Sequence, residues 1–211
     1  MKKFTSLAAA AFVLLASAPA HALTNLVLNG DFSAPALPSG QSYSIFSSIP
    51  DWTNAAIYNG GADGLEIGKS SVYGLPCANA ACLNLEVNAY TFGDVKQTVT
   101  GLVAGKTYDL SWDYGGRNGG GAQQLDVYFG GALVAVDSST GANAKWTHNA
   151  FAIVATGPSE TLEFKSLNVG GTASYGNELA NVTLFAPAPG PAGSILTLAL
   201  LPLLRRLRRR A

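Results

Sequence analysis

The segment from Tyr108 to Tyr114 alternates between apolar and polar side chains without a break. A period of two residues is typical of a β-strand that packs one face on a core and exposes the other face to water. The segment therefore predicts a sheet that is buried on one side and solvated on the other. The predicted core face carries Tyr108, Leu110, Trp112 and Tyr114, and the predicted wet face carries Asp109, Ser111 and Asp113.

Similar short segments, separated by clusters of Gly, Asn, Ser and Pro, recur between residues 23 and 185, where no long helical period is present. Their spacing is typical of an all-β sandwich. The region has the ordinary size of one domain, which we place at residues 23–186. The expected strands span 25–28, 42–49, 83–87, 95–100, 107–114, 125–129, 133–136, 151–155, 161–164 and 181–185.

The first 22 residues have the three parts of a secretory signal peptide. Lys2 and Lys3 precede an apolar stretch over 7–15, and small residues lead to an expected cleavage site after Ala22. The alternative, an uncleaved transmembrane anchor, would need about 20 apolar residues and no cleavage site. We therefore predict an exported protein whose mature chain begins at Leu23.

Residues 187–211 form a second tripartite segment. The motif Pro187-Ala188-Pro189 is followed by an apolar run over 192–204 and then by a basic cluster. The run is shorter than the roughly 20 residues that span a bilayer comfortably, but flanking residues extend it, and a basic cluster stays cytoplasmic. The run has no polar face, which argues against an amphipathic surface helix. The cluster contains Arg205, Arg206, Arg208, Arg209 and Arg210.

This tail resembles the PEP-CTERM sorting signals of Gram-negative bacteria, in which a Pro-Glu-Pro motif, an apolar helix and an arginine cluster end the chain. The resemblance implies a membrane-anchored precursor, contact with the export machinery and removal of the tail by an exosortase. Ala188 stands where the family has Glu. The alternative is a plain C-terminal membrane anchor.

The distribution of charge argues against nucleic acid as a partner. The chain has 13 basic and 13 acidic residues, but seven of the basic residues lie in the two terminal segments. The region between those segments is therefore strongly acidic, whereas a protein that binds a phosphate backbone concentrates Lys and Arg.

The only two cysteines, Cys77 and Cys82, enclose four residues. Thiols of exported proteins are commonly oxidised, so the pair predicts a disulfide that shapes a loop. Closing so short a loop removes little entropy from the unfolded chain, and the expected contribution to stability is modest. A redox-active pair is the alternative, although the spacing is not Cys-x-x-Cys and no neighbouring cation favours a thiolate.

Few residues point to catalysis. Without the signal peptide, His148 is the only histidine, which excludes a site with several histidines in one chain. The common hydrolase and nucleotide-binding motifs are absent, and His148 is expected to be a surface strand residue. Glycosidases need two carboxyl groups across a sugar, and no pair stands out here. The carboxylates that strands could supply are Asp109, Asp113, Asp126, Glu86 and Glu163.

Four segments, over 25–32, 49–52, 97–114 and 179–184, resemble in this order the galactose-binding-like jelly-roll domains, a group that includes carbohydrate-binding modules. The resemblance covers nearly the whole domain. It implies a jelly-roll β-sandwich and a noncatalytic binding function, with extracellular polysaccharide as the expected ligand. Because its motifs are mainly structural, it predicts the fold better than the ligand.

Some members of that group hold a structural calcium ion with carboxylates beside the first and last strands. The corresponding positions here are Ser33 and Ala180, so both carboxylates are absent. Asp31 and Glu178 lie close by in sequence, and carboxylate oxygens suit calcium. The resemblance therefore leaves Asp31 and Glu178 as weak calcium candidates, and we expect no cofactor.

Aromatic rings that bind sugars are exposed, because one face packs on the sugar while the edge stays wet. Trp112 belongs to the predicted core face, and Trp52 and Trp146 align with core positions of the family. Loop tyrosines and their polar neighbours are thus the candidate ligand-binding residues. They are Tyr58, Tyr73, Tyr90 and Tyr175, with Asn88 and Arg117 as polar partners.

Three functional hypotheses follow. The first is a noncatalytic polysaccharide-binding protein of the cell surface or extracellular matrix. The second is a structural surface component without a specific sugar pocket, and the third is an extracytoplasmic hydrolase.

Overall fold

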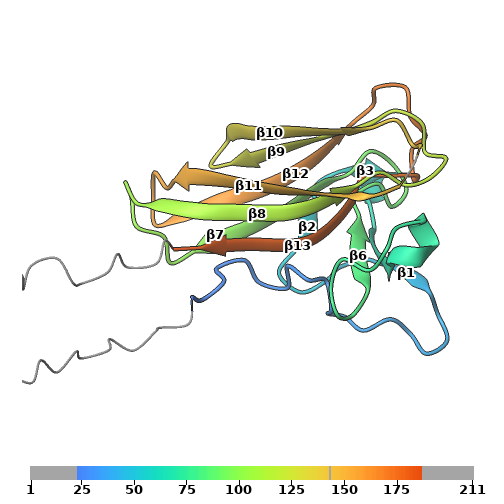
Figure 1. Ribbon diagram of the computed structural model, residues 1–211, viewed down its shortest axis with the longest axis horizontal. Coiled ribbons are helices and arrows are strands. Elements are labelled where there is room, and N and C mark those ends of the chain that lie inside the picture. Colours follow the sequence, from blue (N-terminus) through green and yellow to red (C-terminus); the bar gives the residue numbers. More distant parts are fainter. Residues whose placement is uncertain (1–22, 143, 187–211) are drawn as a thin grey trace, which may run out of the picture.

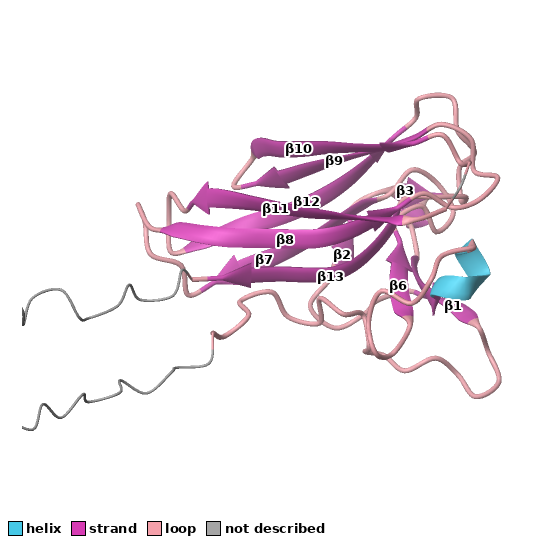
Figure 2. Ribbon diagram, in the orientation of Figure 1, coloured by secondary structure: helices cyan, strands magenta, loops and turns pink. Residues whose placement is uncertain are grey.

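Two antiparallel sheets packed face to face make up the domain (Figure 1). The computed structural model describes residues 23–142 and 144–186, which consist almost entirely of strands and loops (Figure 2). The six-stranded sheet has the order β1 (Tyr43–Phe46), β5 (Leu65–Lys69), β6 (Leu83–Glu86), β13 (Glu178–Phe185), β8 (Thr107–Gly115) and β11 (Trp146–Val154). The five-stranded sheet has the order β10 (Ala132–Ser139), β9 (Gln123–Phe129), β12 (Ser159–Leu167), β7 (Asp94–Thr100) and β2 (Thr53–Asn54).

Two short elements accompany the sheets: a hairpin of β3 (Ile57–Tyr58) with β4 (Gly61–Ala62), and one 3-10 turn, η1 (Ser70–Tyr73). Among the described residues, no helix has the length and apolar character needed to span a membrane. The predicted signal peptide, 1–22, and sorting tail, 187–211, lie outside the described residues. Export and sorting therefore stay predictions.

The core confirms the all-β jelly-roll sandwich that the sequence predicts. Trp112 is fully buried, with its ring centroid 5.9 Å from that of Phe164 in an edge-to-face arrangement and 5.5 Å from that of Phe151 in a stacked one. Trp52 is also buried and contacts Phe164 from the other side. The strands that deliver these rings, β8 and β12, alternate between buried and more exposed residues as expected.

Trp146 does not belong to this core, contrary to the expectation from the resemblance. In the register of β11 against β8 it lies opposite Gly115, on the outer face of the six-stranded sheet. A Cβ at Gly115 would lie 3.1 Å from the indole ring, so the absent side chain makes room for it. The indole is half-buried, and its N–H donates to the carbonyl of Pro76 at 2.7 Å.

One strand prediction was wrong, and the four strands β2 to β5 were missed. Residues 25–28 form a bend with a single bridge at Asn25, because the Asn25 side chain accepts from the Leu184 N–H and the Gln97 side chain bonds both backbone groups of Leu28. The longest of the missed strands is β5, in which the apolar alternation stops at Gly68. That glycine lies under the Tyr73 ring, where a Cβ would come within 2.0 Å of the hydroxyl.

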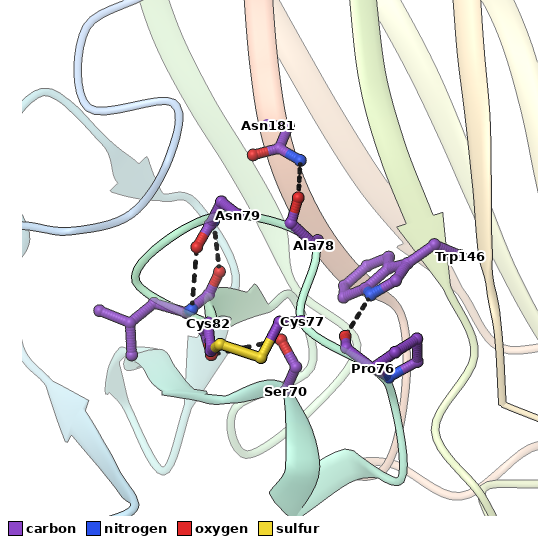
Figure 3. The surroundings of a disulfide bond; sticks show 9 residues. Ser70, Pro76, Cys77, Ala78, Asn79, Cys82, Trp146 and Asn181 are labelled. Atoms are coloured by element: carbon purple, nitrogen blue, oxygen red, sulfur yellow. Dashed lines mark hydrogen bonds between the residues drawn. A yellow bond between two sulfur atoms is a disulfide. The ribbon is translucent and has the colours of Figure 1, made fainter.

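The predicted disulfide is confirmed between Cys77 and Cys82, in a loop that lies against the six-stranded sheet (Figure 3). Hydrogen bonds hold both ends of this loop independently of the sulfur atoms. Asn181 donates to the carbonyl of Ala78 at 2.8 Å, and the Ser70 N–H donates to the carbonyl of Cys82 at 2.9 Å. The disulfide is therefore one of several interactions that hold this loop in place.

We expect reduction of this disulfide to lower stability by about 2 kcal/mol at most, because the cross-linked loop is short. The sandwich should still unfold in one cooperative transition, since the core lies elsewhere. Thermal unfolding of the 23–186 domain with and without reductant measures this, and a Cys77→Ser/Cys82→Ser variant is the control for reductant effects. Loss of the cooperative transition in both the reduced domain and the Cys77→Ser/Cys82→Ser variant would show that the disulfide supports the fold.

Candidate functional site

Three loops meet at one end of the sandwich, on the right in Figure 1: residues 116–122 after β8, 140–145 after β10 and 168–177 after β12. The Gly119 N–H donates to the carbonyl of Gly141, and the Thr172 N–H donates to that of Gly120. Glycine is required at Gly141, which has a φ of 70° and where a Cβ would come within 2.5 Å of the Gly121 nitrogen. The glycines thus let the loops pack backbone to backbone. We name this cluster the loop end.

A cavity of about 440 Å³ opens beside these loops, between the edges of the two sheets. Its walls carry hydroxyl and amide groups and one ammonium group, and none of the lining residues is acidic. Such a wall supplies hydrogen-bond donors and acceptors at fixed positions, which suits a ligand with many hydroxyl groups. The polar lining residues are Tyr114, Gln123, Gln124, Ser138, Ser139, Thr140, Lys145 and Thr147.

The floor of the cavity is held by a buried amide network. The Gln123 side-chain nitrogen lies 2.8 Å from the Gly120 carbonyl and 2.9 Å from the Tyr175 carbonyl, which ties two loops together. Its oxygen accepts from the Asn88 amide at 3.1 Å, and the Tyr114 hydroxyl donates to Asn177 at 2.9 Å. The network holds the loops in position before any ligand arrives.

Asn88, a predicted ligand-binding residue, is therefore corrected to a positioning residue. Its side chain is completely buried, because the Val87 N–H bonds the Asn177 carbonyl and draws this segment under the loops. It can reach a ligand only through Gln123.

Arg117 lies between two of the predicted tyrosines. Its guanidinium carbon is 3.8 Å from the Tyr175 ring centroid and 5.2 Å from that of Tyr73, within the range of cation–π contacts. Its Nη1 also donates to Glu86 at 2.8 Å. Tyr175 is 39% exposed and can offer an edge to a ligand, whereas Tyr73 is buried and is corrected to a supporting residue.

Below Arg117, three glutamates form a row across the six-stranded sheet. Glu66 lies opposite Glu86 in the register of β5 with β6, and Glu86 lies opposite Glu178 in that of β6 with β13. Burial, and then the charge of Glu66, raises the pKa of Glu86 to about 8. Burial, followed by the charges of Glu86 and Glu66, raises the pKa of Glu178 well above its ordinary value. The row was not foreseen as a unit, because its members are far apart in sequence.

The surroundings of Asp31 and Glu178, the two weak calcium candidates, do not fit a calcium site. Calcium is coordinated by six to eight oxygen atoms. Asp31, however, lies in an exposed loop and accepts hydrogen bonds from Ser33, whereas Glu178 is buried beside Asn84. One oxygen of Glu178 has no hydrogen-bond partner. This oxygen does not make a metal site, because within 23–142 and 144–186 no three His, Cys, Asp or Glu side chains are arranged to hold a metal ion.

Tyr58 and Tyr90 form a separate aromatic platform. Their rings are stacked, with centroids 4.9 Å apart and an interplanar angle of 15°, and they are 41% and 43% exposed. Tyr58 comes from β3 and Tyr90 from the loop after β6, two residues beyond Asn88. Gly64 permits this approach, since a Cβ there would lie 3.2 Å from the Tyr90 ring. The pairing of the two exposed rings could not be read from their positions in sequence.

His148 lies on the exposed outer face of the six-stranded sheet, as expected for a surface strand residue. Its Nδ1 is 2.8 Å from Asp113, whose second oxygen accepts from Asn181 at 2.6 Å. The neighbouring hydroxyl of Ser111 is engaged with Thr183. The described contacts thus give His148 a carboxylate partner but no nucleophile to activate.

The polar residues that line the cavity were not predicted from the sequence as ligand-binding residues. Gln123 and Gln124 follow the glycine-rich run 115–121 after one intervening residue, Ala122, and that run is the signal that could have marked them. Ser139 ends β10, and Thr140 and Lys145 come from the following loop, whose polar residues are typical of any turn.

No protein-family model matches the chain, and no curated protein matches it significantly. Among solved structures, it is similar to TmCBM61 in complex with β-1,4-galactotriose (11% identity, 77% of this chain and 99% of that one, TM-score 0.45). It is also similar to a family 35 carbohydrate-binding module from Clostridium thermocellum (11%, 69% and 99%, TM-score 0.39) and to the C-terminal domain of the sugar-binding protein EclA (24%, 47% and 70%, TM-score 0.36). With scores below 0.5, these similarities assign no ligand to this chain.

Proposed function

We propose that the domain is a noncatalytic carbohydrate-binding module whose site is the loop end, and that its ligand is an extracellular polysaccharide. The observation that carries the proposal is a polar cavity with no acidic lining residue beside exposed tyrosine rings. Tyr175 belongs to loop 168–177 of the loop end, and Tyr58 belongs to β3, which lies at the same end of the sandwich in Figure 1. A sugar presents hydroxyl groups around its rim and an apolar patch on its ring face. The cavity wall can form hydrogen bonds with the hydroxyl groups, and the tyrosine rings can pack against the apolar face of the sugar.

Preorganisation supports the proposal. Tyr175 is held by Arg117, and its backbone carbonyl accepts from the buried Gln123 amide. A ring that is already fixed loses little conformational entropy when a ligand packs against it. The contacts of Asp113 and His148, in contrast, supply no activated nucleophile, which favours binding over catalysis.

Export belongs to the same proposal. The signal-like segment 1–22 and the PEP-CTERM-like tail 187–211 would deliver the domain to the cell surface or beyond, where polysaccharide is present. An intact-mass measurement on the mature protein that lacks Arg205–Arg210 would support processing of the tail. A mass that retains these arginines would indicate a plain membrane anchor.

The binding test uses the 23–186 domain, a glycan panel and the exopolysaccharide of the source organism, with calcium and with chelator. We expect saturable binding that Tyr175→Ala, Tyr58→Ala or Tyr90→Ala weakens about tenfold or more, because each removes an aromatic contact surface. Isothermal titration calorimetry gives the affinities.

Tyr128→Ala is the matched control. Tyr128 is a partly exposed tyrosine on the outer face of the five-stranded sheet, beside the β9–β10 turn at the opposite end of β9 from Gln123. If Tyr128→Ala weakened binding about tenfold or more and the other three variants did not, the site would lie on that sheet face. Absence of binding to every glycan would favour the structural surface component, and turnover of polysaccharide fragments would favour the hydrolase.

A further inference from the structure

The four sheet edges differ in how well they are protected against pairing with another chain. β1 has four residues and β2 has two, so neither offers a long template. β10 is interrupted by a bulge between Leu133 and Ala135. Short strands and bulges are common protections of edge strands.

β11 lacks these protections. It runs for nine residues, pairs with β8 through nine consecutive positions without a register shift, and contains no Lys, Arg, Asp, Glu, Pro or Gly. Its other edge has no partner strand among the described residues. Two of its large apolar side chains, Phe151 and Val154, are 38% and 57% exposed. A long, regular and uncharged edge is a template for an added strand.

The sequence of β11 is compatible with itself in antiparallel pairing. The midpoint of Trp146–Val154 is Ala150, so a two-fold axis there pairs all nine residues. Ala150 would face Ala150 of the second copy, and His148 would face Ala152. Asn149 would face Phe151, which would cover part of that exposed ring. No like charges are brought opposite one another, and the small side chains at the axis allow close approach.

We propose that β11 is a self-association edge, through which a second copy of this chain extends the six-stranded sheet across a two-fold axis. The occupant is a second copy because β11 supplies both halves of a full-length, charge-free pairing. The dimer would point the two loop ends in opposite directions. The function of this dimer rests on the proposed carbohydrate binding: one dimer would link two polysaccharide chains.

Sedimentation equilibrium of the 23–186 domain, without any glycan, tests the proposal. We expect twice the chain mass at high concentration. Ala150→Lys and Ala150→Glu each place two like charges at the axis and should weaken the dimer about tenfold or more. An equimolar mixture of the two variants should restore it, because Lys and Glu then face each other. Ala150 is exposed, and circular dichroism checks that both variants fold.

Val136→Lys on β10 is the matched control, since Val136 is 53% exposed on a bulged edge and should not affect the dimer. A wild-type domain that is monomeric at millimolar concentration would overturn the proposal. So would a dimer that persists in both Ala150 variants, or one that the mixture fails to restore. Because no sugar is used, these outcomes are independent of the binding test.

Discussion

Replacement of Trp112 by Ala should lower the free energy of unfolding by about 3 to 5 kcal/mol, because it removes the central side chain of a closely packed core. Trp112 has no exposed surface and contacts both Phe164 and Phe151. Its indole N–H also donates to the buried Asp137 at 2.8 Å, so the substitution deprives a buried carboxylate of a donor. Urea-induced unfolding followed by circular dichroism measures the loss.

Two variants separate the contributions. Trp112→Phe keeps an aromatic ring but removes the donor to Asp137, and it should cost less than Trp112→Ala. Trp146→Ala removes an indole of the same size from the outer face of the sheet, and it should also cost less because that indole is only partly buried. If Trp146→Ala were the more destabilising, the assignment of the core would be wrong.

Stability should fall as the pH rises from about 5 to about 9. The pKa of Glu86 is raised from 4.5 to about 8 in the folded protein, so folding favours its protonated form. The contribution is complete below a pH of about 4.5 and is lost as the pH approaches 8. At about 1.4 kcal/mol per pKa unit, the loss is on the order of 5 kcal/mol. Burial raises the pKa of Glu66, Glu178 and Asp137 in the same direction, while hydrogen bonds from Thr156 and Gly157 lower that of Glu160 and oppose the trend.

Unfolding free energies at several pH values test this dependence, and Glu178→Gln is the informative variant. It removes one ionisable group of the row but keeps an acceptor for the Asn84 amide, which lies 2.6 Å from the Glu178 carboxylate. Stability above pH 7 should therefore decline less steeply than in the wild type. A wild-type stability that rises through this pH range would contradict the assignment of raised pKa values.

The fold could be predicted because three of its long strands, β7, β8 and β12, obey one simple rule. β8 and β12 pack one face on a core and expose the other, so alternation in sequence translates directly into buried and exposed sides. β5 breaks the rule because Glu66 is buried on the outer face, under Tyr73 and Arg117. The burial of β5 therefore does not alternate, whereas its sequence alternates only over Leu65, Glu66 and Ile67 before Gly68, which is too short a pattern to mark a strand.

The candidate site was only partly predictable. Loop tyrosines and Arg117 could be singled out by residue type, but which of them meet depends on pairings that are distant in sequence. Arg117 reaches Glu86, 31 residues earlier, only because the loop after β8 folds back over the sheet. Asn88 and Tyr73 sit in turn-like sequence, and their burial follows from loops that cover them in three dimensions.

Polysaccharide binding at the loop end is tested by titration of the isotope-labelled 23–186 domain with polysaccharide from the source organism, followed by amide NMR. If the loop end binds the polysaccharide, we expect saturable shifts at residues 116–122, 140–145 and 168–177 and around Tyr58 and Tyr90, with the amide of Tyr128 unchanged. Shifts centred on Tyr128 and Lys96, on the outer face of the five-stranded sheet, would contradict the loop end as the site. A spectrum that no polysaccharide changes would contradict carbohydrate binding itself.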